Sequence, residues 1–106
     1  MTDETLTATL PLRRWQGEKA TYHLVSFTGE HAEAIAMHAR LLKLELGTRR
    51  GFGSVKVMAR IGETRWKTSV FPQDKSAEWI LLVSKKVMRA EGLAPDDPVA
   101  VELALL

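Results

Sequence analysis

Residues 54–71 read SVKVMARIGETRWKTSVF, two segments of alternating polarity that meet at Gly62-Glu63. Apolar side chains take every second position of the first segment, which predicts a strand with one buried face. Glycine at the first central position of a two-residue loop is typical of a type II′ turn. The sequence therefore predicts a β-hairpin in which residue 61 lies opposite 64, 59 opposite 66, 57 opposite 68 and 55 opposite 70.

This register sorts the hairpin side chains onto two faces. The face predicted to line the core consists of Val55, Val57, Ala59, Ile61, Thr64, Trp66, Thr68 and Val70. We expect Trp66 to be buried inside the fold. The opposite face gathers four cations, with Arg60 directly across from Arg65 and with Lys56 and Lys67 beside them.

The four cations predict a site for an anion. Like charges paired across strands are mildly destabilising, and an anion that bridges them removes this cost. At about 3.3 Å per residue, the span from Lys56 to Arg60 is about 13 Å, comparable with two phosphates of an extended strand. Together with the two arginines before the hairpin, the predicted ligand-binding residues are Arg49, Arg50, Lys56, Arg60, Arg65 and Lys67. The expected ligand is a phosphorylated metabolite or single-stranded nucleic acid.

The same charges have a simpler interpretation. Charged strand faces are common on soluble proteins, where they keep the protein in solution and prevent unwanted strand pairing. The loop RRGFGSVKV, residues 49–57, is also weak as a phosphate motif because it leads into a strand instead of a helix N-terminus. Its Phe52 either fills the end of a barrel or offers a surface on which a base stacks.

Outward from the hairpin, the pattern predicts four further strands and two helices. The strands are expected over Thr5 to Arg13, Thr21 to Phe27, Trp79 to Val83 and Val99 to Leu105. Residues 21–27 are apolar on both faces, which leaves open whether Tyr22 and Leu24 or Val25 and Phe27 are buried. Six strands with two helices predict a mainly β fold, a small closed six-stranded barrel with the longer helix packed on it.

The longer helix is expected to run from Thr28-Gly29 to Leu46 and to stop at Gly47. Its predicted apolar stripe is Ile35, Ala39, Leu42 and Leu46, widened by Met37, Leu41 and Leu44. The short helix is expected over Lys85 to Glu91, with Ser84 as its N-cap and Gly92 at its end.

Composition indicates one soluble domain over residues 1–106. An apolar content of 45% with 26% charged residues is ordinary for a globular protein. The chain has no cysteine, no apolar run long enough to span a membrane and no recognisable secretory signal, so we expect a cytoplasmic protein without a membrane partner. The net charge of +2 does not by itself imply nucleic acid.

Motifs for catalysis are missing from the sequence. His31 and His38 are seven positions apart on the expected helix, too far to ligate one metal, and no serine lies in a nucleophile elbow. We therefore predict a non-enzymatic binding module with no catalytic residue, no metal and no cofactor. A structural or protein-interaction domain with no small ligand is the alternative, and the oligomeric state stays open.

Four segments together resemble a known family: RRGFGSVKV, ARIGETRWKTSVFP, WILLVSKKVMRAEGL and PDDPVAVEL. It is the bacterial domain-of-unknown-function family numbered nineteen-oh-five. The resemblance covers nearly the whole chain and implies a small β-barrel with a packed helix, which sometimes precedes a domain of the YdeI/OmpD-associated type. It implies no activity. Where the family has Gly-Asp in the last turn this chain has Asp96-Asp97, so Asp96 must adopt left-handed backbone geometry.

Overall fold

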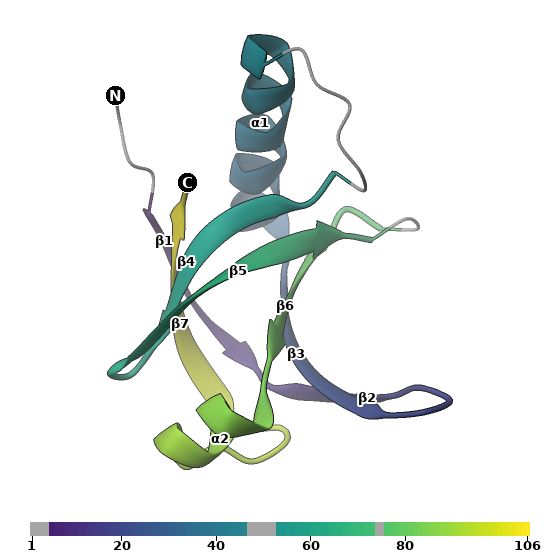
Figure 1. Cartoon of the computed structure of the whole chain (residues 1–106), viewed down its shortest axis with the longest axis vertical. Helices are drawn as coiled ribbons and strands as arrows, with labels where there is room; N and C mark the ends of the chain where they lie inside the picture. The colour runs from purple at the N-terminus through teal and green to yellow at the C-terminus, as the bar shows by residue number, and fades with distance from the viewer. Residues whose placement is uncertain (1–4, 47–52, 74–75) are drawn as a thin grey trace.

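The computed structural model describes residues 5–46, 53–73 and 76–106, apart from the side chains of Leu42, Lys43, Glu45 and Leu46. Within these ranges the chain forms seven strands and two helices (Figure 1). In chain order they are β1 (Thr5–Pro11), β2 (Arg13–Gln16), β3 (Thr21–Phe27), α1 (Gly29–Leu46), β4 (Val55–Ile61), β5 (Thr64–Pro72), β6 (Trp79–Val83), α2 (Lys85–Glu91) and β7 (Pro98–Leu105). The mainly β class with two helices is confirmed.

The strands form one antiparallel sheet in the order β1-β7-β4-β5-β6-β3-β2. The sheet curls into a half-barrel, so the prediction of a closed six-stranded barrel is wrong. One reason is that the predicted first strand is two strands, which bend apart at Leu12 and pair with β7 and β3 respectively. The other is that β5 pairs with β6 only from Val70 to Pro72, and the two strands then diverge.

The β4–β5 hairpin has the predicted register, with Ile61 opposite Thr64 and Val55 opposite Val70. Gly62 has a φ of 61°, as the first central position of a type II′ turn requires. Val55, Val57, Ala59, Ile61 and Val70 are buried, which confirms the inward face. Trp66 also points to this side but is only partly buried, which corrects its assignment to the closed interior.

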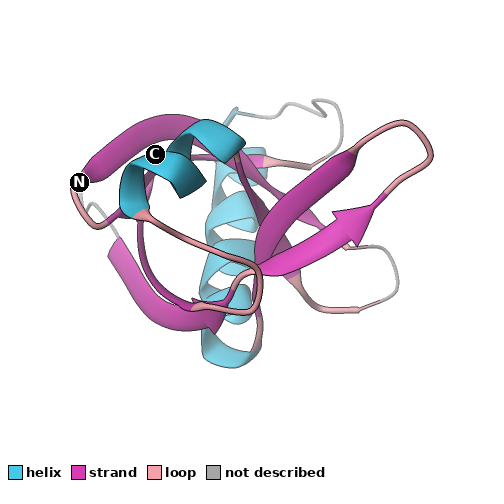
Figure 2. Cartoon of the chain, turned by 90° about the horizontal axis from the view of Figure 1, so that it is seen from below, coloured by secondary structure: helices cyan, strands magenta, loops and turns pink. Residues whose placement is uncertain are grey.

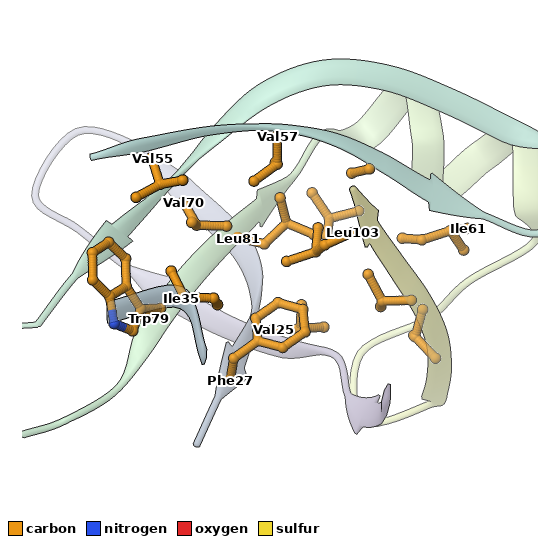
Figure 3. Close-up of a cluster of buried hydrophobic side chains, with 14 of the residues drawn as sticks. Val25, Phe27, Ile35, Val55, Val57, Ile61, Val70, Trp79, Leu81 and Leu103 are labelled. Carbon is orange, nitrogen blue, oxygen red and sulfur yellow. The ribbon is translucent and has the colours of Figure 1, made fainter. Parts of the chain in front are cut away.

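The core lies on the concave side of the sheet, where labelled side chains from β3, β4, β6 and β7 point toward one another (Figure 3). On β3 the inward residues are Val25 and Phe27, which resolves the ambiguity of that segment. Helix α1 covers one end of this core with Ile35 and Ala32. Two histidine side chains fix it to the sheet: the Nε2 groups of His31 and His38 donate to the carbonyls of Thr7 and Leu106 at 3.0 and 2.9 Å.

The predicted widening of the α1 stripe is wrong, because Met37, Leu41 and Leu44 are exposed. The stripe itself is confirmed at Ile35, which is buried, and at Ala39, which is half-buried against the core together with Ala36. The helix crosses the end of the sheet and presents only a narrow face to it. The parts of the stripe at Leu42 and Leu46 lie outside the described side chains. Neither helix of the described chain is long and apolar enough to cross a membrane.

Helix α2 lies at the opposite end of the sheet from α1 (Figure 2). Its predicted caps are confirmed: the Ser84 hydroxyl accepts from the Val87 N–H at 3.2 Å, and Gly92 is left-handed with a φ of 64°. The turn that follows contains Asp96 with a φ of 75°, the left-handed geometry expected there. Its N–H donates to the Leu12 carbonyl at 2.7 Å, so this turn ties the bend between β1 and β2 to the start of β7.

Candidate functional site

The outer face of the β4–β5 hairpin carries the predicted cations. The register places Arg60 opposite Arg65 and Lys67 opposite Met58, and all four cationic side chains of this hairpin are exposed. We call Lys56, Arg60, Arg65 and Lys67 the basic face. β5 and the adjoining β4 hold these residues on regular strands, so their spacing is fixed by the sheet.

One of these cations is already paired. β7 runs beside β4 and places Glu102 next to Arg60, whose Nε donates to Glu102 Oε1 at 2.5 Å. The Arg60 Nη1 group also donates to the Gly62 carbonyl at 3.2 Å. Among the side chains that the structure describes, this is the one ion pair. Glu102 therefore relieves the repulsion between Arg60 and Arg65, and Lys56, Arg65 and Lys67 are the cations that stay available.

The other two predicted ligand residues, Arg49 and Arg50, lie outside the described residues, as does Phe52 with its two interpretations. The structure therefore brings together four of the six predicted residues. Gly53, at the end of that loop, is described and has a φ of 74°, consistent with a glycine that permits positive φ.

A cleft of about 340 Å³ lies where β5 and β6 diverge. Its walls come from the end of β6 with the start of α2, the start of β3, and the inward side of β5. The residues that line it include Tyr22, His23, Trp66, Thr68, Leu82 and Lys85. The cleft thus combines aromatic surface with hydroxyl groups and one ammonium.

The cleft adjoins the basic face across β5. Successive residues of a strand point to opposite sides, so Trp66 faces the cleft while its neighbours Arg65 and Lys67 point outward. β6 does not cover this part of β5, because their pairing is confined to Val70–Pro72. Trp66 and Lys67 therefore flank this uncovered part of β5 from opposite sides.

Sequence reasoning missed the cleft residues of β3 and β6. Alternation along β5 assigns Trp66 and Thr68 to the inner side, but it does not show that β6 ends its pairing before reaching them. The sequence did, however, indicate that the outer surface of β3 and β6 is apolar. The segment WILLV is apolar on both faces and YHLVSF places large apolar side chains on both, which is typical of strands covered on both sides.

No element in the described structure covers that outer surface. Trp15 pairs with Tyr22, Leu24 with Leu82, and Ile80 with Phe71 across neighbouring strands. The Trp15 and Tyr22 rings are stacked with centroids 5.6 Å apart. We call these six residues the outer apolar face: Trp15, Tyr22, Leu24, Phe71, Ile80 and Leu82. Four of them are large apolar side chains that the structure leaves exposed.

The histidines take structural positions. His31 and His38 bond main-chain carbonyls, and His23 is buried beside Val25 on the inward side of β3. In the part of the chain that the structure describes, no three histidine, aspartate or glutamate side chains gather in a way that would hold a metal ion.

The fold and the site define a small, mainly β domain with a basic outer face and an open cleft. The chain belongs to the family described as Domain of unknown function (DUF1905), which matches residues 9–103, nearly its whole length. The resemblance seen in the sequence is therefore confirmed. Among the curated proteins, none matches this chain.

Proposed function

We propose that this domain is a non-catalytic binding module for a ligand that carries phosphate beside a flat ring. Phosphorylated nucleoside metabolites and single-stranded nucleic acid share this chemistry. One observation carries the proposal: the free cations of the basic face lie directly beside a cleft that contains Trp66. The lack of a catalytic motif in the sequence supports a binding role, and a cytoplasmic location remains part of the proposal.

We assign separate roles to the two sides of β5. Arg65 and Lys67 attract phosphate on the outer side, and the ring lies against Trp66 in the cleft, where stacking contributes about 1–3 kcal/mol per base. Lys85 supplies a further positive charge on the far wall. Thr68, which lies on the inward side of β5 with Trp66, offers a hydroxyl group to the edge of the ring.

The test is a titration of a labelled single-stranded oligonucleotide at two salt concentrations. Each neutralised phosphate contributes about −0.7 to the slope of log affinity against log salt. Four cations would give about −3, but Glu102 already pairs Arg60, so we expect about −2 from Lys56, Arg65 and Lys67.

Matched variants decide whether the basic face is the site. Replacing Arg65 and Lys67 by glutamate should flatten the slope and weaken binding, with little loss of stability because both side chains are exposed. The control replaces Arg13 and Lys19, two exposed cations outside the hairpin, and makes the same change in net charge. Equal loss in both variants, or no binding at low salt, would show that the basic face has no ligand of this class.

A second candidate function, a protein-interaction domain, is favoured by the outer apolar face. Large exposed apolar patches are rare on soluble monomers, and they often mark sites of protein interaction.

A further inference from the structure

We infer that His23 forms a hydrogen bond with the edge of the ring that enters the cleft, and that this ring is a nitrogen heterocycle of the nucleobase class. The inference rests on the proposed function, because it takes the cleft beside Trp66 as the place of the ring. It adds one residue to that site and narrows its ligand, since a hydrocarbon ring would leave His23 without a partner.

His23 is a buried polar side chain that bonds to nothing in the protein. It is only 9% exposed, and it lies on the inward side of β3. The side chains of His31 and His38 bond main-chain carbonyls, whereas the His23 ring forms no hydrogen bond within the residues that the structure describes. An apolar side chain would fill this position in β3 without the cost of burying a polar group that has no partner.

The ring nitrogens of His23 reach the cleft. Among the described side chains, every nitrogen or oxygen that is sealed from solvent has a hydrogen-bond partner. Since the His23 nitrogens have none, they keep contact with open space although the side chain as a whole is buried. His23 borders the cleft of about 340 Å³, which provides that space. Its packing therefore fixes the ring and leaves its polar atoms to an occupant of the cleft.

The other side of the cleft is aromatic. Val83 of β6 pairs with His23, and at this level β6 no longer pairs with β5. β6 lies between β3 and β5 in the sheet, so the buried Val83 separates His23 from Trp66, and both border the cleft. A flat ring that stacks on the indole has one face occupied, and its edge remains for a hydrogen bond.

The nucleobase class follows from what these two side chains can bind. The neutral form of an imidazole has one donor and one acceptor nitrogen. Nucleobases carry both kinds of partner on their edges; adenine, for example, has an amino group beside an acceptor ring nitrogen. A phenyl ring has neither, and a sugar has no flat face for Trp66. A free nucleotide and a base of a single strand share this chemistry.

Calorimetric titration with three phosphates tests the inference: adenosine monophosphate, phenyl phosphate and ribose 5-phosphate. Wild-type protein should bind adenosine monophosphate about three- to tenfold more tightly than phenyl phosphate, the factor that one hydrogen bond contributes. His23→Phe keeps a flat side chain without nitrogen and should remove this preference. His38→Phe is the matched control on α1, at the other end of the sheet, and should retain it.

Thermal unfolding and proton resonances supply independent readouts. His23→Phe removes no hydrogen bond of the free protein and should unfold no earlier than wild type, whereas His38→Phe loses its bond to the Leu106 carbonyl and should unfold earlier. If His23→Phe does not fold, wild-type protein still decides: the ring protons of His23 should shift with adenosine monophosphate and not with ribose 5-phosphate. An excess of single-stranded oligoadenylate distinguishes the two sources, because it displaces the nucleotide only if a base of a strand enters the cleft.

The outcomes separate this inference from the proposed function. Equal binding of adenosine monophosphate and phenyl phosphate, unshifted His23 protons, or a folded His23→Phe variant that keeps the preference would overturn the role of His23 and leave the phosphate-binding module standing. Failure of all three phosphates and of the oligonucleotide to bind at low salt would overturn both.

Discussion

Leu12 is the residue at which one continuous segment passes from one edge of the sheet to the other, and replacing it by alanine tests how the half-barrel is held. Its side chain is fully buried. Its N–H donates to the Asp97 carbonyl at 2.9 Å, and its carbonyl accepts from the Asp96 N–H at 2.7 Å. Alanine keeps both main-chain bonds, so the variant reports on the side chain alone.

The size of the effect follows from this arrangement. Leucine-to-alanine changes in protein cores cost about 2–5 kcal/mol, and more where the surroundings cannot collapse into the space. The two main-chain bonds hold the bend in position, so we expect a loss of about 3–4 kcal/mol. A domain of this size has a free energy of unfolding of about 5–15 kcal/mol, so the variant should remain folded but clearly weakened.

Urea denaturation followed by circular dichroism measures this loss, with Leu82→Ala as the control of identical chemistry. Leu82 is 40% exposed, so its truncation should cost less than about 1 kcal/mol. Equal losses for the two variants would refute the view that the Leu12 side chain anchors the bend. A loss below about 1.5 kcal/mol at Leu12 would refute it as well.

Two further predictions concern the hairpin. Gly62→Ala should destabilise the fold by about 2–3 kcal/mol for two reasons. The residue has a φ of 61°, which strains an alanine, and an added Cβ would lie 2.0 Å from Glu91 Oε1. This clash would displace the Glu91 carboxylate, which accepts a hydrogen bond from the Thr64 hydroxyl at 2.6 Å. Adding Glu91→Ala should recover part of this loss in a double-mutant cycle, and strictly additive losses would contradict the predicted clash. Trp66→Ala should cost about 1–3 kcal/mol by urea denaturation, less than a fully buried tryptophan, and a loss above about 4 kcal/mol would show that the cleft is closed in solution.

The hairpin and the short helix were predictable from the sequence because residues within or next to each element determine its bounds. The hairpin register followed from Gly62-Glu63 and strict alternation, and α2 from the spacing of Ser84 and Gly92. The openness of the sheet, a half-barrel where a closed barrel was expected, was not predictable from such rules. Leu12 continues the alternation of the residues before it, so nothing local marks the bend, which depends on main-chain bonds to a turn over eighty residues later in the chain.

The candidate sites were likewise predictable where local pattern determines them and unpredictable where the position of a distant strand does. Which cations share a face followed from the register, whereas the pairing of Arg60 with Glu102 needed the position of β7, which sequence reasoning did not place. On β3, the undecided choice between two apolar faces was itself informative. One face fills the core with Val25 and Phe27, and the other forms the outer apolar face with Tyr22 and Leu24.

The pairing of β1 with β7 has a consequence for how this domain connects to other chains. Thr5 lies opposite Ala104, so the two ends of the described fold are neighbours on adjacent strands, about 5 Å apart. A host protein could therefore carry this domain within one of its surface loops, entering and leaving at the same point, without its own loop ends being forced apart. Because both connections emerge beside α1, such an insertion would leave the β5 edge and the far side of the sheet facing away from the host.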